Sequence, residues 1–266
     1  MGKINIALIL TAAAITLAAC KKVISVDLHN VAPQIVIEGE VTNVKGPYRV
    51  RISRSVDFSA SNTFPPVTNA DVYLTDSTNG ITDHLVQADS GLYLARRTVG
   101  VAKHTYVLNV TIDGKQYTAS STIPRPVLLD SVTFALNFDF NNKQEINAVV
   151  NFQDPPGLGN YYQFTEVVNG RTLPDIFVFE DRLSDGRYIE QPLFNDSSYL
   201  HKSDDVVVTM NCVDKNIYNY FFTLANVTGN NNFQTATPAN PVTNITGGAL
   251  GYFSAHTTQR IEIQVY

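Results

Sequence analysis

The sequence is poor in charged residues and in cysteine. Charged residues form 16% of the 266 residues, whereas soluble domains usually contain about 25%. Lysine occurs nine times and glutamate seven times, which is few for a helical protein. Two cysteines cannot build a disulfide-rich scaffold or a zinc site with four thiolates. The net charge of −5 argues against a nucleic-acid partner, because such a protein must neutralise many phosphates.

Residues that favour β-strands are abundant. Valine occurs 29 times, threonine 25, phenylalanine 14 and tyrosine 13, together 81 of the 266 residues. These side chains fit pleated, half-buried surfaces. The composition therefore predicts an all-β protein and argues against a helical bundle, a coiled coil or a disordered tail.

The first nineteen residues have the pattern of a signal peptide. Lys3 is the only charged residue among them, and the sixteen residues 4–19 carry no charge. In a helix this segment would span about 24 Å, too short to cross a bilayer core and typical of a signal sequence. It ends in Leu17-Ala18-Ala19-Cys20, which resembles a bacterial lipobox. We therefore predict that residues 1–19 are removed and that Cys20 is lipidated.

A lipidated Cys20 would fix the chain to a membrane. Two or more acyl chains of the palmitate kind anchor a protein stably, so a bacterial three-chain modification would be effectively permanent. Residues 20–32 show no strong periodicity and are predicted to form a tether. The alternative is an ordinary secretory signal with an accidental cysteine. Lipidation would leave Cys212 as the only thiol, and its apolar surroundings in the sequence predict a small buried side chain rather than a nucleophile or a partner cysteine.

A strand pattern runs through residues 33–125. Apolar and polar residues alternate at 48–53, as in a strand with one buried face. Asp113-Gly114 is a favoured two-residue hairpin turn, because both residues accept positive φ. About seven short, evenly spaced strands predict a β-sandwich. Pro124-Arg125-Pro126 marks the end of this domain, because proline fixes φ and donates no backbone hydrogen bond.

Residues 126–266 are predicted to form a second β-sandwich with one covering helix. The helix is expected at about residues 215–227, with Asp214 as its cap and Gly229 as its end. The expected strands are Ser131–Asn137, Ile146–Gln153, Tyr161–Val168, Phe177–Glu180, Asp205–Asn211 and Gln259–Tyr266. The predicted fold is thus two antiparallel β-sandwich domains, Ig-like or transthyretin-like.

Several short motifs are spread along the chain. They are Val36-Ile37-Glu38-Gly39, Gly46-Pro47-Tyr48-Arg49-Val50, Ile52-Ser53-Arg54-Ser55, Gly91-Leu92-Tyr93, Asp154-Pro155-Pro156-Gly157, Asn160-Tyr161-Tyr162, Phe179 and Asp181 ahead of Asp185-Gly186, and Gly247-Gly248-Ala249-Leu250-Gly251-Tyr252-Phe253. With the lipobox, they resemble the Bacteroidota lipoproteins catalogued as domain of unknown function 4249, over essentially the whole mature chain. The resemblance implies an outer-membrane lipoprotein, often encoded beside TonB-dependent receptors. It implies no reaction and supplies no catalytic residues.

Acidic residues gather between positions 175 and 190. The group consists of Asp175, Glu180, Asp181, Asp185 and Glu190. A glycosidase would need two carboxyl groups about 5–9.5 Å apart, and a calcium loop of the EF-hand type fails here, because its third position is Leu183 and its twelfth is Pro192. We keep Asp181 and Asp185 as weak binding candidates. The alternative is a hairpin turned at Asp185-Gly186 with solvated acids.

Arg49 and Arg51 are predicted to project from one face of a strand. Such a basic strip could grip an anionic glycan or a carboxylate of a partner. The alternative is an exposed sheet face whose charges discourage edge aggregation.

The remaining motifs predict no catalytic, cofactor or metal site. Gly247–Gly251 lacks the lysine of a phosphate-binding loop, and the five histidines show no metal-ligand spacing. Ser254 and His256 are close in sequence, but a hydrolase triad needs its base placed in space.

The expected function is that of a lipid-anchored binding or accessory protein of the outer membrane, not an enzyme, with a TonB-dependent transporter as its partner class. No aspartate follows Cys20, which argues against inner-membrane retention. Lys21-Lys22 lacks the acidic cluster of surface-export signals, so the periplasmic or surface face stays open. The alternatives are a carbohydrate-active hydrolase that uses acids between Asp175 and Glu190, and a surface adhesin or structural protein.

Overall fold

The computed structural model describes residues 32–56, 63–138, 144–195, 199–228 and 240–266. The predicted signal peptide, Cys20 and nearly all of the predicted tether lie outside these residues. The chain divides into Met1–Ala32 and a compact unit, Pro33–Tyr266.

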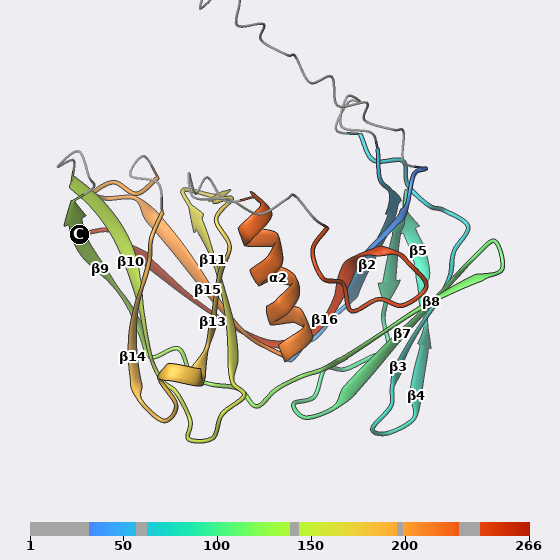
Figure 1. Ribbon diagram of the computed structural model, residues 1–266, viewed down its shortest axis with the longest axis horizontal. Helices are drawn as coiled ribbons and strands as arrows, with labels where there is room; N and C mark the ends of the chain where they lie inside the picture. The colour runs from blue at the N-terminus through green and yellow to red at the C-terminus, as the bar shows by residue number, and fades with distance from the viewer. Residues whose placement is uncertain (1–31, 57–62, 139–143, 196–198, 229–239) are drawn as a thin grey trace, which may run out of the picture. The chain divides into compact units, whose positions relative to one another are not determined.

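The compact unit is built from three β-sheets (Figure 1). The largest has the strand order β12-β11-β15-β16-β1-β2-β6-β5, and β13 also pairs with β11. The second has the order β14-β10-β9, and the third has the order β4-β3-β7-β8. The strands are β1 Ile35–Thr42, β2 Tyr48–Arg54, β3 Asp71–Asp76, β4 Ile81–His84, β5 Val86–Asp89, β6 Leu92–Ala95, β7 Thr105–Ile112, β8 Lys115–Thr122, β9 Ser131–Phe138, β10 Gln144–Gln153, β11 Tyr161–Val168, β12 Arg171–Thr172, β13 Phe177–Glu180, β14 Tyr188–Leu193, β15 Asp205–Val213 and β16 Leu250–Gln264.

Two hydrophobic cores lie in this unit. The first contains Ile37, Val50 and Leu108, from β1, β2 and β7. The second contains Phe152 and Phe164, from β10 and β11. Buried and exposed residues alternate along β1, β2 and β7, because successive side chains of a strand point to opposite faces. The prediction of an all-β, sandwich-like fold is confirmed.

The last strand, β16, takes part in both halves of the largest sheet. Its residues 250–256 pair with β1 in parallel, from Val36↔Leu250 to Thr42↔His256. Its residues 257–264 pair antiparallel with β15. Phe253 therefore lies in the first core, although it is far along the chain from the other members. The sequence predicted only Gln259–Tyr266 as a strand, and it did not predict the parallel pair. The two predicted domains, 33–125 and 126–266, are consecutive segments of the chain. The first core, however, also contains residues of the second segment, such as Ile245 and Phe253.

The predicted helix is present as α2, Lys215–Thr228. Asp214 caps it, because its Oδ1 accepts hydrogen bonds from the backbone N–H groups of Asn216 (2.9 Å) and Ile217 (3.0 Å). The helix packs against β13, β11 and β16 (Figure 1). Gly229, the predicted end of the helix, lies outside the described residues.

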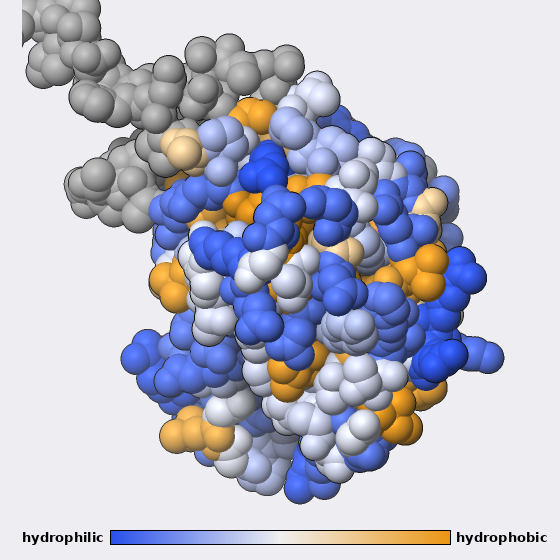
Figure 2. All heavy atoms as spheres, turned by 90° about the vertical axis from the view of Figure 1, so that its right-hand side faces the viewer, coloured by the Kyte–Doolittle hydropathy of each residue, from blue (hydrophilic) through white to orange (hydrophobic). Residues whose placement is uncertain are grey.

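The surface gives no sign of a large apolar area on the side drawn in Figure 2. Hydrophobic residues occur there in small groups among polar ones. Within the described part of the chain, no helix combines the length and apolar character needed to cross a membrane.

Candidate functional site

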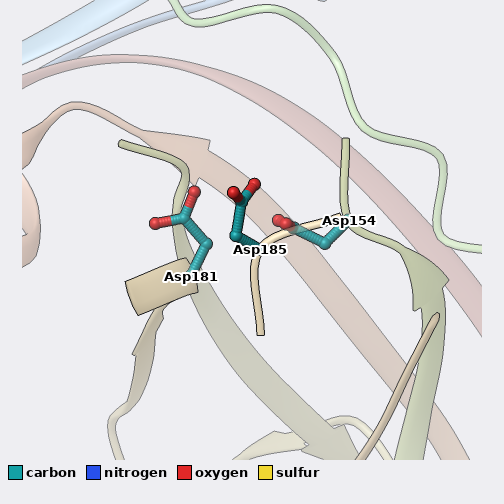
Figure 3. A group of neighbouring side chains, drawn as sticks. All are labelled: Asp154, Asp181 and Asp185. Carbon is teal, nitrogen blue, oxygen red and sulfur yellow. The ribbon is translucent and has the colours of Figure 1, made fainter. Parts of the chain in front are cut away.

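Three aspartates meet beside the second core (Figure 3). Asp154 follows β10, Asp181 begins the short 3₁₀ helix η1 (Asp181–Leu183), and Asp185 precedes β14. One carboxylate oxygen of each lies within 4.8 Å of the others. Asp154 and Asp181 are buried, at 0% and 3% exposure, and Asp185 is exposed. The structure thus brings the two predicted acids together and adds Asp154, whose signal in the sequence was the Asp-Pro-Pro-Gly motif.

The carboxylates of this aspartate cluster hold the loop 155–160 in place. Asp181 accepts hydrogen bonds from the backbone N–H groups of Gly159 (3.1 Å) and Asn160 (2.9 Å) and from Asn160 Nδ2 (2.9 Å). Asp185 Oδ1 accepts one from the Gly157 N–H (2.6 Å). These bonds provide protein acceptors for the backbone N–H groups of Gly157, Gly159 and Asn160 where the loop turns back on η1.

Asp154 ties the same loop to the core. Its Oδ1 accepts a hydrogen bond from the Tyr162 hydroxyl, and its Oδ2 accepts one from the Gly186 N–H (3.0 Å). Burial, together with the hydrogen bond to the Asp154 carboxylate, raises the pKa of Tyr162. Three carboxylates at this spacing are ligands of the kind that Ca²⁺ prefers. Their existing hydrogen bonds account for all three without an ion.

The predicted hairpin at Asp185-Gly186 is wrong. β13 pairs with β11 in the largest sheet, whereas β14 pairs with β10 in the three-stranded sheet. The chain therefore crosses from one sheet to another through η1. The Asp-Gly pair signals only a residue at positive φ, here Gly186 at +68°, and that conformation also serves turns that are not hairpins. Asp181 is not solvated, because its carboxylate is bonded to the loop.

Replacing Asp181 with alanine is expected to lower the free energy of unfolding by about 2 kcal/mol, because it removes the buried carboxylate that accepts three hydrogen bonds from Gly159 and Asn160. Asp185→Ala is the matched control: Asp185 is exposed and accepts one backbone bond, so we expect a loss below about 1 kcal/mol. Urea denaturation followed by circular dichroism measures both. Equal losses for the two variants would contradict the structural role of Asp181.

The other acids of the predicted group lie apart from this cluster. Glu180 forms an ion pair with Arg182 (3.3 Å). Glu190 lies on β14 opposite Asn151, and Asp175 lines a cavity described below. The structure therefore divides the five acids among different surroundings.

Arg49 and Arg51 lie on the exposed face of β2, as predicted. Glu38 and Glu40 stand beside them on β1, with Glu38 directly opposite Arg51. The four side chains line a cavity of about 230 Å³. Partial burial raises the pKa of Glu40, and the positive charge of Arg49 opposes that shift. The predicted basic strip therefore lies beside an acidic strip on the neighbouring strand β1.

A second cavity, of about 300 Å³, shares Glu40 and Tyr252 with the first. Its wall comes from four neighbouring strands of the largest sheet, β11, β15, β16 and β1. Segment 173–176 and Phe221 of α2 line it as well. The polar side chains that line it are Glu40, Gln163, Thr165, Asp175, Asn211, Ser254 and His256. We call it the α2 cavity.

Ser254 and His256 come together in the α2 cavity. They lie two residues apart on β16, and Ser254 Oγ is 2.8 Å from His256 Nδ1. Burial lowers the pKa of His256 to about 4, so the imidazole is neutral at neutral pH. The other described histidines, His84, His104 and His201, each pair with a different aspartate. Ser254 and His256 could be singled out in the sequence, but Gln163 and Asn211 could not. The sequence offers no signal for these two amides beyond their places on predicted strands.

An amide pair on the neighbouring strands β11 and β15 forms another part of the wall. Asn211 Nδ2 donates a hydrogen bond to Gln163 Oε1 (3.3 Å). Asn211 Oδ1 is buried and has no hydrogen-bond partner. The neighbouring Cys212 points into the second core and is 2% exposed, and burial raises the pKa of its thiol.

A family model described as a domain of unknown function (DUF4249) matches residues 21–262. A search of curated proteins found no match.

Proposed function

The chain belongs to the DUF4249 family, and from that premise we propose that it is a lipid-anchored binding or accessory protein of the outer membrane of a Bacteroidota cell. In this proposal lipid on Cys20 holds it beside a TonB-dependent transporter. The observation that carries it is the lipobox at residues 17–20, followed by a compact unit that begins at Pro33.

Two features support binding rather than turnover. The two cavities on the largest sheet, which share Glu40 and Tyr252 in their linings, present hydrogen-bonding side chains and two aromatic rings, Tyr252 and Phe221. The buried acids of the aspartate cluster accept hydrogen bonds from backbone N–H groups and from Tyr162. These bonds give the acids a structural role. An anchor raises the local concentration of a binding site near a membrane partner.

The anchor is tested by expressing the full chain, Cys20→Ala and Cys212→Ala in the source bacterium with labelled palmitate. We expect label and outer-membrane fractionation for the full chain and for the control Cys212→Ala. Cys20→Ala should lose both. Label retained in Cys20→Ala would overturn the anchor.

The partner is tested by affinity purification of the full chain after gentle detergent extraction. A TonB-dependent receptor is expected to co-purify with the full chain and to be depleted from Cys20→Ala preparations. If no outer-membrane receptor is enriched above an untagged control, the partner proposal is lost.

A further inference from the structure

The lining of the α2 cavity disfavours negatively charged ligands. Within the described residues its lining contains no lysine or arginine, and it contains two acidic residues, Glu40 and Asp175. An anion would meet like charge in a partly desolvated site, which costs free energy. Arg49 lies close enough to Glu40 to offset part of the negative charge of that carboxylate, which weakens the attraction of the cavity for a cation.

The same lining can both donate and accept hydrogen bonds. The carboxylates and the Asn211 Oδ1 accept, the amide nitrogens donate, and the hydroxyls of Ser254 and Thr165 do both. The neutral imidazole of His256 adds one donor and one acceptor, with its Nδ1 already beside Ser254. A ligand hydroxyl also donates and accepts at once. Such a lining therefore matches several adjacent hydroxyl groups better than a single charged group.

One side of the cavity is apolar. The rings of Phe221 and Tyr252 lie with their centroids 5.0 Å apart at an interplanar angle of 61°, and Leu173 and Ile176 lie nearby in the lining. Aromatic rings offer flat apolar area with little loss of conformational entropy. A ligand with one hydroxyl-rich edge and one C–H face would satisfy both sides of this cavity.

We propose that the α2 cavity binds one neutral sugar unit, with its hydroxyls on the Gln163–Asn211 and Ser254–His256 pairs and its C–H face on Phe221 and Tyr252. Its volume of about 300 Å³ lies at the lower end of the range for small-molecule sites. The neighbouring cavity beside Arg49 and Arg51 gives room for a second sugar unit linked to the first. This inference rests on the proposed binding function and names its ligand class.

The test uses the mature full chain in a zwitterionic, sugar-free detergent. Isothermal titration calorimetry measures binding of glucose, galactose, mannose and N-acetylglucosamine, with glucuronate and glucosamine as charged analogues. We expect a Kd of about 1 mM or lower for at least one neutral sugar, and at least tenfold weaker binding of glucuronate, whose carboxylate would meet Glu40 and Asp175. No binding of any neutral sugar, or tighter binding of a charged analogue, would overturn the inference.

Two variants locate the site, and one serves as the control. Asn211→Ala and Phe221→Ala should each weaken the binding at least tenfold. Asn109→Ala, on the exposed part of β7, should leave it unchanged. Urea midpoints verify that each variant is folded, and Phe221 provides the test if Asn211→Ala is not. Unchanged binding in a folded Phe221→Ala would overturn the assignment. A transporter that co-purifies with a chain that binds no sugar would leave the proposed function standing and remove only this inference.

Discussion

Replacing Gly251 with alanine is expected to lower the free energy of unfolding by about 4 kcal/mol or more. Gly251 has a φ of +93° and lies opposite Ile37 in the parallel pair of β1 and β16. A Cβ at this position would clash with the carbonyl oxygen of Ile37 and would lie 2.9 Å from its carbonyl carbon. Neither backbone can retreat without breaking the pairing that joins the first and last strands.

Gly248→Ala provides a matched control for this experiment. Gly248 also has positive φ, +78°, but a Cβ there would meet nothing within 4 Å. Only the left-handed conformation is then penalised, by about 1–2 kcal/mol. Urea denaturation followed by circular dichroism compares the two variants. If Gly251→Ala loses no more than Gly248→Ala, the close approach of β16 to β1 is not as the structure has it.

Local features of the fold could be predicted from the sequence. Asp113-Gly114 turns the hairpin of β7 and β8 with φ values of 50° and 81°, because the turn chemistry is contained in the two residues. The α2 helix follows in the same way from its apolar spacing and from the Asp214 cap. Each of these signals lies within one short segment, so no knowledge of distant partners was needed.

The pairing of β1 with β16 could not be predicted, because it joins segments more than two hundred residues apart. The glycines at 247, 248 and 251 obscured the strand that begins at Leu250, because glycine is uncommon inside strands. The same limit applied to the sites. Asp181 and Asp185 were visible as neighbouring acids, but Asp154 joins them only through the sheet crossing. Gln163 and Asn211 lie opposite each other on β11 and β15. A single amide side chain on a strand does not indicate a binding site in the sequence, because such residues are common on exposed sheet faces.

Glu166 should make the stability of the protein depend on pH between about 5 and 8. Its side chain is 1% exposed, and Asn195 Nδ2 donates a hydrogen bond to its Oε2 (2.5 Å), while its Oε1 is buried without a partner. Burial raises its pKa from 4.5 to about 7, the hydrogen bond from Asn195 opposes this shift, and the negative charge of Asp175 adds to it.

The sign of the effect follows from proton binding. The native state holds the proton of Glu166 more tightly than the unfolded state, so the carboxyl stabilises the fold fully below its unfolded pKa. That contribution is lost as the pH rises from about 4.5 through 7. A shift of this size corresponds to about 3 kcal/mol.

Urea midpoints of the wild-type protein should therefore fall between pH 5 and pH 8, whereas Glu166→Gln, which stays neutral, should keep a nearly constant midpoint. Glu190→Gln, at an exposed position of β14, should retain the wild-type slope, and a Glu166→Gln variant with that same slope would show that Glu166 does not cause it.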